Sequence, residues 1–302
     1  MKQLIFIHGI NNQDKKQDEI ESTWLTALQN TPAEGSSGWL NDIRIQTAYY
    51  ADVLFKAEQE WDETSSAVSP MSSISPEEDF ASDEIASLYF ELQRKCGLSD
   101  ETVRTYLKPV ERDQPVSPMG RGIHKSWLKA IARAIEDIVP CAGRGLATVF
   151  LRQAAAYLYK PGLYEQVNML VQQQVIDKCD DLSETVVIAH SLGSVIGYVT
   201  LRQLFTAKKI PLFVTLGSPL GINIIKRRIS PPYISPSSTK KWVNGSDPND
   251  FVALHPALTP QTFGPASVEN IAELNNGYDD PHDIVKYLSQ PVIIQEIKRA
   301  LV

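Results

Sequence analysis

One junction in the middle of the chain limits the folds that are open to it. The β-branched run Thr185–Ala189 has the pattern of a buried strand, and residues 192–207 have the apolar spacing of a helix. Only His190 and Ser191 separate the two, so the chain must pass from strand to helix through a very tight turn. Such a passage is typical of α/β proteins, in which helices connect the strands of a parallel sheet.

Strand and helix alternate at both ends of the chain. Helices are expected at Glu21–Gln29 and Pro291–Leu301, and further strands at Leu4–Ile7, Ile43–Tyr50, Pro211–Leu216, Lys241–Asn244 and Ile271–Leu274. Short continuous apolar runs are typical of strands that are buried on both faces of a parallel sheet. The predicted fold class is therefore α/β, with a mostly parallel central sheet flanked by helices.

The middle of the chain has a different character. Residues 56–180 are predicted to be a helical cap or insertion within a single domain that spans residues 1–302. Its helices are expected at Ser82–Cys96, Ser99–Leu107, Gly122–Val139, Leu146–Tyr159 and Leu163–Lys178. A segment at 64–80 is rich in Ser, Pro and acidic residues, which is the composition of flexible chain.

Composition excludes several classes of function. The net charge of −7 argues against a nucleic-acid-binding protein, whose electrostatic footprint is basic. No apolar run reaches the ~18 residues of a membrane span, and the apolar run at the amino terminus is too short for a signal peptide. The three cysteines form no CxxC pair, so we expect neither a disulfide framework nor a metal site. These features together predict a cytoplasmic protein.

Ser191 is the candidate nucleophile. A tight strand-to-helix turn exposes a serine hydroxyl, and small residues two positions before and after it, here Ala189 and Gly193, let the chain turn without clashes. Alanine stands where the common G-x-S-x-G pattern has its first glycine. The backbone N–H of Leu192 begins a helix and is the expected donor to an oxyanion. The alternative is an ordinary turn in which the glycine serves close packing.

The loop after the first predicted strand is expected to supply a second oxyanion donor. Gly9 lets the backbone approach the site, and the N–H of Ile10 is the expected donor. His8 is expected to order this loop through hydrogen bonds rather than to transfer a proton. His8 and Gly9 are both expected beside the substrate.

Five histidines compete for the role of general base. His8 and His190 lie in the two turn motifs, and the His190 side chain, although expected near the substrate, is expected to point away from that of Ser191. His124 lies in the insertion. His282 lies in a polar loop at the carboxyl end of the last predicted strand, where α/β sheets carry their chemistry. We predict His282 as the base, with His255 as its main competitor.

Two aspartates follow the strand at Lys241–Asn244 and are candidates for the acid that orients the base. Asp247 precedes a proline and has the pattern of an Asx turn. Asp250 is therefore the predicted acid, with Asp247 as the alternative.

Five segments in this order resemble the α/β-hydrolase fold lipase-like serine esterases: LIFIHGI, AHSLGS, LGSPLG, WVNGSDPNDFVAL and PHDIVKYL. The resemblance covers about 1–55 and 180–302. It implies an α/β-hydrolase fold in which Asp250 is the acid, His282 is the base and 56–180 is a variable cap. It also implies that segment 216–221 lines the site, with Pro219 and Leu220 beside the substrate.

The expected activity is hydrolysis of a small-molecule or lipid ester by a Ser-His-Asp triad through an acyl-enzyme, without metal or organic cofactor. Alternatives are a phospholipase, a thioesterase or an acyltransferase with the same triad, and a non-catalytic binding protein that keeps the fold. A peripheral membrane contact is expected from the apolar segments Leu146–Leu151 and Ala154–Tyr159 and from the basic cluster Lys226-Arg227-Arg228. The alternatives are that these segments pack on the core and that the cluster is a solvated face.

Overall fold

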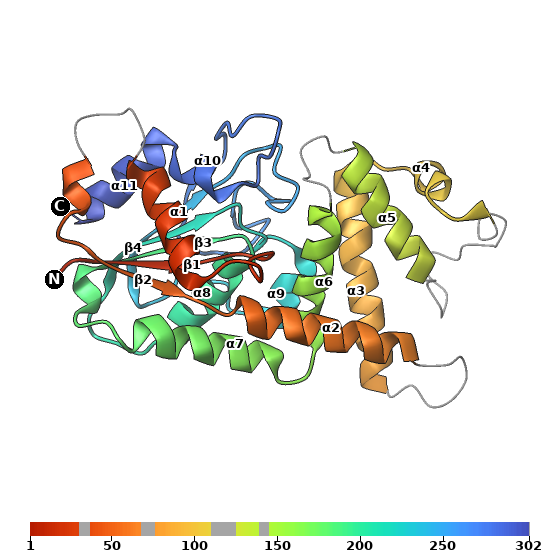
Figure 1. Ribbon diagram of the computed structural model, residues 1–302, viewed down its shortest axis with the longest axis horizontal. Helices are drawn as coiled ribbons and strands as arrows, with labels where there is room; N and C mark the ends of the chain where they lie inside the picture. The colour runs from red at the N-terminus through yellow and green to blue at the C-terminus, as the bar shows by residue number, and fades with distance from the viewer. Residues whose placement is uncertain (30–36, 68–75, 110–124, 139–144, 302) are drawn as a thin grey trace.

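A single parallel sheet lies at the centre of the protein (Figure 1). The computed structural model describes residues 1–29, 37–67, 76–109, 125–138 and 145–301. Within these residues the strand order is β2-β1-β3-β4-β5-β6, and each neighbouring pair is parallel. The strands are β1 (Gln3–Ile7), β2 (Arg44–Ala48), β3 (Thr185–His190), β4 (Ile210–Leu216), β5 (Thr239–Gly245) and β6 (Glu269–Ile271). The predicted α/β class with a parallel central sheet is confirmed.

The last strand lies earlier in the chain than predicted. The sequence pattern placed it at Ile271–Leu274, whereas β6 ends at Ile271. Leu274 is buried, as a strand residue would be, but its N–H donates to the carbonyl of Ser246, beyond the end of β5. In the sequence, the apolar side chain of Leu274 therefore looks like that of a strand residue, although it lies in a buried loop.

Alternate residues of the central strands face two separate cores. One face of the sheet packs against α1 (Gln17–Gln29), α10 (Ile284–Leu288) and α11 (Pro291–Leu301). On this face the buried strand residues include Leu4, Phe6, Val186, Ile188, Leu212 and Val214. The opposite face, which carries Ile5, Ile7, Val187, Ala189 and Phe213, packs against α8 (Leu192–Gln203) and the helices of the insertion. This two-sided burial is the reason why the strands have continuous apolar runs.

The insertion is helical and shares a core with the sheet. Its helices are α2 (Ala51–Ala67), α3 (Pro76–Lys95), α4 (Asp100–Thr105), α5 (Lys125–Ile138), α6 (Leu146–Tyr159) and α7 (Leu163–Val171), followed by a short π-helix at Gln172–Ile176. Figure 1 shows α3, α4 and α5 at the end of the molecule opposite to both termini, with α6 nearer the sheet. One continuous cluster of buried side chains runs from the sheet face into these helices.

The insertion departs from the prediction at its beginning. Helix α2, which was not predicted, starts at Ala51, before the expected boundary at 56. In the segment 64–80, predicted to be flexible, residues 64–67 belong to α2 and residues 76–80 belong to α3. Pro76 occupies the first turn of α3, where proline is well tolerated because its missing N–H needs no partner there. Residues 68–75 of that segment, like His124, lie outside the described residues.

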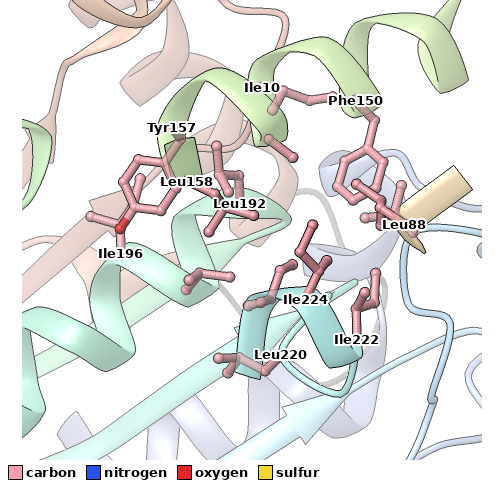
Figure 2. Packing of buried hydrophobic residues seen from close by; sticks show 14 of the residues in the cluster. Ile10, Leu88, Phe150, Tyr157, Leu158, Leu192, Ile196, Leu220, Ile222 and Ile224 are labelled. Atoms are coloured by element: carbon pink, nitrogen blue, oxygen red, sulfur yellow. The ribbon is translucent and has the colours of Figure 1, made fainter. Parts of the chain in front are cut away.

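The two apolar segments considered for membrane contact are largely buried. Together they form α6, in which Phe150, Leu151 and residues 154–158 are buried. Figure 2 shows Tyr157 and Leu158 of this helix close to Leu192 and Ile196 of α8. These segments therefore pack on the core.

The basic cluster lies within α9 (Asn223–Ile229) and has partners within the protein. Lys226 Nζ donates to the carbonyl of Thr262, while Arg228 pairs with Glu165 and lies 4.1 Å from the ring centre of Tyr164. The cluster thus gives no support to a membrane contact. Across the described part of the chain, helices long and apolar enough to cross a membrane are absent.

Helix α8 begins directly against the end of β1. A Cβ atom at Gly193 would collide with the carbonyl oxygens of Ile7 and His8. Both obstacles are backbone atoms of a central strand and the loop that follows it, so neither can move aside cheaply. Only glycine lets the helix start this close to the sheet.

We predict that Gly193→Ala destabilises the protein. Alanine is favoured over glycine inside a helix by about 1 kcal/mol, but the collision with the backbone of β1 outweighs that gain. We expect the free energy of unfolding to fall by about 1–3 kcal/mol, as for other overpacked positions. Urea denaturation measures the change. The control is Ser194→Ala in the same helix, which removes only a 3.3 Å hydrogen bond to Ala189. Equal stability of the two variants would contradict the packing argument.

Candidate active site

The predicted site residues come from loops that follow different strands. Ser191 follows β3, Gly217 follows β4 and Asp250 comes shortly after β5. His282 follows β6, and residues 8–11 follow β1. Because all of these strands are parallel, their carboxyl ends meet along one edge of the sheet. The topology therefore brings residues that are up to about 270 positions apart to one place.

Ser191 stands at a strained turn. Its backbone has φ 53° and ψ −130°, a conformation that non-glycine residues rarely adopt. Its N–H donates to the carbonyl of Leu216 at 3.0 Å, and its carbonyl accepts the N–H of Ser194 at 2.9 Å. The side chain makes no capping bond to α8, and its Oγ is buried without a hydrogen-bond partner in the described residues. Backbone hydrogen bonds thus fix the position of Ser191, while its hydroxyl takes part in no structural hydrogen bond within the described residues.

His282 and Asp250 form a buried pair. His282 Nδ1 lies 2.8 Å from Asp250 Oδ2, and both side chains are almost fully buried. The other oxygen, Oδ1, accepts the backbone N–H groups of Val252 (2.9 Å) and Ala253 (3.4 Å). Because a carboxylate only accepts, the proton of the neutral imidazole is assigned to Nδ1. Nε2, which has no partner in the described residues, is left as a proton acceptor.

The alternative acid and the alternative base have other roles. Asp247 Oδ1 accepts the N–H of Asn249 at 2.7 Å, which is the Asx turn that the sequence predicts, and Oδ2 accepts the N–H of Asn276 at 2.5 Å. His255 Nε2 lies 3.4 Å from a carboxylate oxygen of Glu91 on α3, outside the pocket that Ser191 lines. The structure therefore pairs His282 with Asp250.

Tyr287 is a site residue that the sequence did not reveal. Its hydroxyl donates to Asp250 Oδ2 at 2.8 Å and accepts the N–H of Asp247 at 3.0 Å. Burial, followed by the charge of Asp250, raises the pKa of this phenol well above its ordinary value, so it remains a donor. In the sequence Tyr287 is merely an aromatic residue five positions after His282, so only its place on the apolar face of a short helix could be inferred.

Gly217 provides the space behind Asp250 and His282. It has φ 54°, and a Cβ there would lie 2.7 Å from Asp250 Oδ2 and 3.1 Å from His282 Nδ1. The segment 216–221 thus lies behind Asp250 and His282 and is not part of the pocket lining. Pro219 and Leu220 were predicted beside the substrate, but neither lines the pocket, and Leu220 is fully buried in the core. Their apolar character serves packing.

Two backbone N–H groups near Ser191 are available to an oxyanion. Those of Ile10 and Leu192 donate to no acceptor within the described residues. Leu192 is adjacent to Ser191, and a Cβ at Gly9 would lie only 2.6 Å from the Cβ of Ser191. The loop after β1 therefore reaches the serine, as predicted for Gly9 and Ile10, and both residues line the pocket.

His8 orders this loop but does not reach the pocket. Its Nδ1 lies 2.7 Å from the carbonyl of Gly9, its Nε2 lies 3.4 Å from the backbone N of Tyr50, and its ring stacks on that of Tyr50 at 4.1 Å. Burial lowers the pKa of His8 to about 4, so the ring is neutral. The predicted ordering role fits these contacts. The predicted place beside the substrate does not, because the side chain is enclosed.

His190 lies next to the base, and its predicted direction away from Ser191 is wrong. Its ring is 4.6 Å from that of His282, its Nε2 lies 2.8 Å from the backbone carbonyl of His282, and it lines the same pocket as Ser191. Simple alternation fails because the positive φ of Ser191 breaks the strand geometry there. Burial, followed by the proximity of His282, lowers the pKa of His190, so the ring is a neutral donor to that carbonyl.

A pocket of about 150 Å³ joins these groups. Ser191 and His282 line this pocket together with Leu146 of α6. The remaining lining residues are Gly9, Ile10, Asn11, Asn12, Lys15, Ile20, Thr23, Trp24, His190, Asp280, Asp283 and Ile284. The lining is mixed in polarity. A carbonyl compound in this pocket would meet the residues that carry a hydroxyl, an imidazole nitrogen and the Ile10 N–H, whereas Leu192, the other predicted donor, does not itself line the pocket.

No group of three His, Cys, Asp or Glu side chains in the described residues is arranged to hold a metal ion. Comparison of the chain with known protein families, with curated proteins and with solved structures found no match.

We predict that the protein becomes less stable as the pH is lowered, because His8 is buried. Its pKa is 6.5 in the unfolded chain and about 4 in the fold, so between these values the unfolded chain binds the extra proton. The contribution is fully present above the unfolded pKa and is lost as pH falls towards the folded pKa. Its size corresponds to roughly 3 kcal/mol. His8→Gln should give a flatter dependence of the free energy of unfolding on pH, measured by urea denaturation from about pH 7 to about pH 4. An unchanged dependence would show that His8 does not titrate in this way.

We predict that Tyr287→Phe lowers the free energy of unfolding by about 1–3 kcal/mol, because the buried N–H of Asp247 loses its acceptor and Asp250 loses a donor. Tyr278→Phe is the matched control, since Tyr278 is 77% exposed. Thermal or urea unfolding of both variants measures the difference. Indistinguishable stabilities would mean that the Tyr287 hydroxyl does not support the acid.

Proposed function

We propose that the protein is a serine hydrolase of the α/β-hydrolase fold that cleaves carboxylic esters. The observation that carries the proposal is the hydrogen bonding of three side-chain atoms, His282 Nδ1, His282 Nε2 and Ser191 Oγ. Asp250 holds the proton of His282 on Nδ1, while His282 Nε2 and Ser191 Oγ, which line one pocket, are both without a partner in the described residues. Buried polar atoms are nearly always paired. Two orphaned atoms of this chemistry in one pocket favour a catalytic role over a structural one.

The reaction proceeds in two steps. Ser191 Oγ attacks the ester carbonyl while its proton passes to His282 Nε2, and the imidazolium that forms is stabilised by Asp250. The N–H groups of Ile10 and Leu192 stabilise the oxyanion. His282 then gives the proton to the leaving alkoxide. Water attacks the acyl-enzyme with His282 again as the base, which releases the acid and restores Ser191. No step requires a metal or an organic cofactor.

The substrate we propose is a small ester. The pocket of about 150 Å³ and its mixed lining suit a short acyl group better than a long alkyl chain. The burial of α6 removes the surface that a lipase would use as an apolar lid. A thioesterase or an acyltransferase would use the same triad and differ only in the leaving group or the acceptor, so the substrate panel must include both.

We predict that Ser191→Ala lowers kcat/KM for p-nitrophenyl acetate by about 10⁴-fold or more, because the attacking atom is removed. The same change should abolish labelling by a fluorophosphonate probe. Ser238→Ala, which removes another fully buried serine hydroxyl that bonds only to a backbone carbonyl, is the control and should be labelled like the wild type.

Acetate, butyrate and palmitate esters of p-nitrophenol separate the alternatives. Preference for the short chains supports the proposal, and preference for palmitate with activation by micelles would indicate a lipase. Absence of turnover on esters and thioesters, together with absence of labelling, would indicate a binding protein and overturn the proposal.

A further inference from the structure

Helix α6 reaches the candidate site at three points along one face. Leu146 lines the pocket. Phe150 packs edge-on against Phe251 at 6.3 Å, and that ring in turn lies 6.4 Å from His282. Gln153 accepts the backbone N–H of Asn11 at 3.1 Å. Spacings of four and three residues put all three side chains on the same side of a helix. Figure 2 shows Ile10 of the loop beside this helix and Phe150.

The orientation of the Gln153 amide is determined by its neighbours. The side chain is 2% exposed, and its Nε2 donates to Glu58 Oε2 on α2 at 3.0 Å. Because a carboxylate only accepts and a backbone N–H only donates, Nε2 must face Glu58 and Oε1 must face Asn11. Glu58 is itself held by Arg152, whose Nε lies 3.0 Å from Oε1. Side chains of α2 and α6 thus hold Gln153 Oε1, the acceptor for the Asn11 N–H, in place.

That acceptor holds one of the two peptide groups that flank Ile10. The peptide between Gly9 and Ile10 is held through the Gly9 carbonyl, which contacts His8 Nδ1 at 2.7 Å and accepts from Asn12 Nδ2 at 3.2 Å. The next peptide is held at both ends, since the Ile10 carbonyl accepts from Asn12 Nδ2 at 2.8 Å and the Asn11 N–H donates to Gln153. Peptide groups are planar and trans, so fixing one side of each group fixes the other.

The backbone of Asn11 turns sharply at this point. Its φ is 58°, in the left-handed region, where asparagine is one of the few non-glycine residues that occur. Without this acceptor, the N–H of Asn11 would have no hydrogen-bond partner within the described residues, and the loop would be held less firmly. Relaxation of Asn11 would turn the adjacent peptide groups and with them the N–H of Ile10.

We infer that Gln153 is a positioning residue for the loop at residues 8–11, which carries the proposed oxyanion donor Ile10. The helical insertion thereby completes the catalytic site instead of merely covering it. The inference rests on the proposed function, because it takes the N–H of Ile10 as an oxyanion donor. It extends that proposal to a residue of the insertion, which neither the nucleophile motif nor the triad includes.

The test compares two buried amides of the insertion. Gln153→Leu removes the acceptor for Asn11, and Asn168→Leu removes an amide that bonds only to Tyr157 and Tyr164, away from the site. We expect Gln153→Leu to lower kcat for p-nitrophenyl acetate by about 10- to 100-fold, less than the loss of a donor itself, with KM changed less than about threefold. Asn168→Leu should keep the wild-type kcat, although it loses comparable hydrogen bonds.

A double variant tests the same hydrogen bonds with the amide and the carboxylate exchanged between positions 58 and 153. In E58Q/Q153E, the new carboxylate accepts from Asn11 and from the amide at position 58, whose oxygen still faces Arg152. We expect kcat within about threefold of the wild type, with both variants normalised to the active-site concentration from fluorophosphonate titration. If Gln153→Leu fails to fold, the double variant decides alone, because it keeps every donor and acceptor paired.

The outcomes distinguish this inference from the proposed function. Wild-type kcat in a folded Gln153→Leu, an equal loss in Asn168→Leu, or an inactive folded double variant would overturn the positioning role while the Ser191 chemistry stands. Absence of activity in the wild type would overturn both.

Discussion

The close approach of β1 and β3 at their carboxyl ends is the constraint on which the rest of the structure depends. Gly9 and Gly193 form the two sides of that contact: a Cβ on the first would meet Ser191, and a Cβ on the second would meet the backbone of residues 7 and 8. With both Cβ atoms missing, a loop backbone lies within reach of the serine and a helix begins beside it. Under the proposed function, this close approach is what lets donors from two loops reach one oxygen.

The polar groups around this contact are neutral or paired, and nearly all of them are enclosed. His8 and His190 are kept uncharged by burial, and each is tied to a backbone carbonyl of the loop that it supports. Asp250 has donors on both oxygens. A network of this kind is rigid when complete and costly when one member is removed, because the remaining partners are buried. Ser191 Oγ and His282 Nε2 are buried without a hydrogen-bond partner in the described residues, and under the proposed function they are the atoms that react.

The sequence was informative wherever a residue type and a local pattern were sufficient. Buried strands were visible as apolar runs, and the serine turn and the Asx turn at Asp247 follow from short-range rules that hold within a few residues. The direction of His190 was missed because one positive φ interrupts strand alternation. Tyr287, Gln153 and the burial of Leu220 depend on which segments meet in three dimensions. Nothing local marks a tyrosine or glutamine that finds its partner tens of residues away, and helix α2 carries a weak apolar pattern next to an acidic, serine-rich segment.

Helix α6 combines two properties, a place in the main core and a place in the wall of the candidate site. Its buried side chains belong to the main core, while Leu146 lines the pocket and Gln153 holds the loop beside it. In proteins whose substrate range is set by surface loops, the loops vary freely because stability lies elsewhere. Under the proposed function, a change of substrate preference would have to be accommodated by a helix that also stabilises the fold. Divergence towards new substrates would then proceed through the loop after β6, with α6 the slowest part of the pocket wall to change.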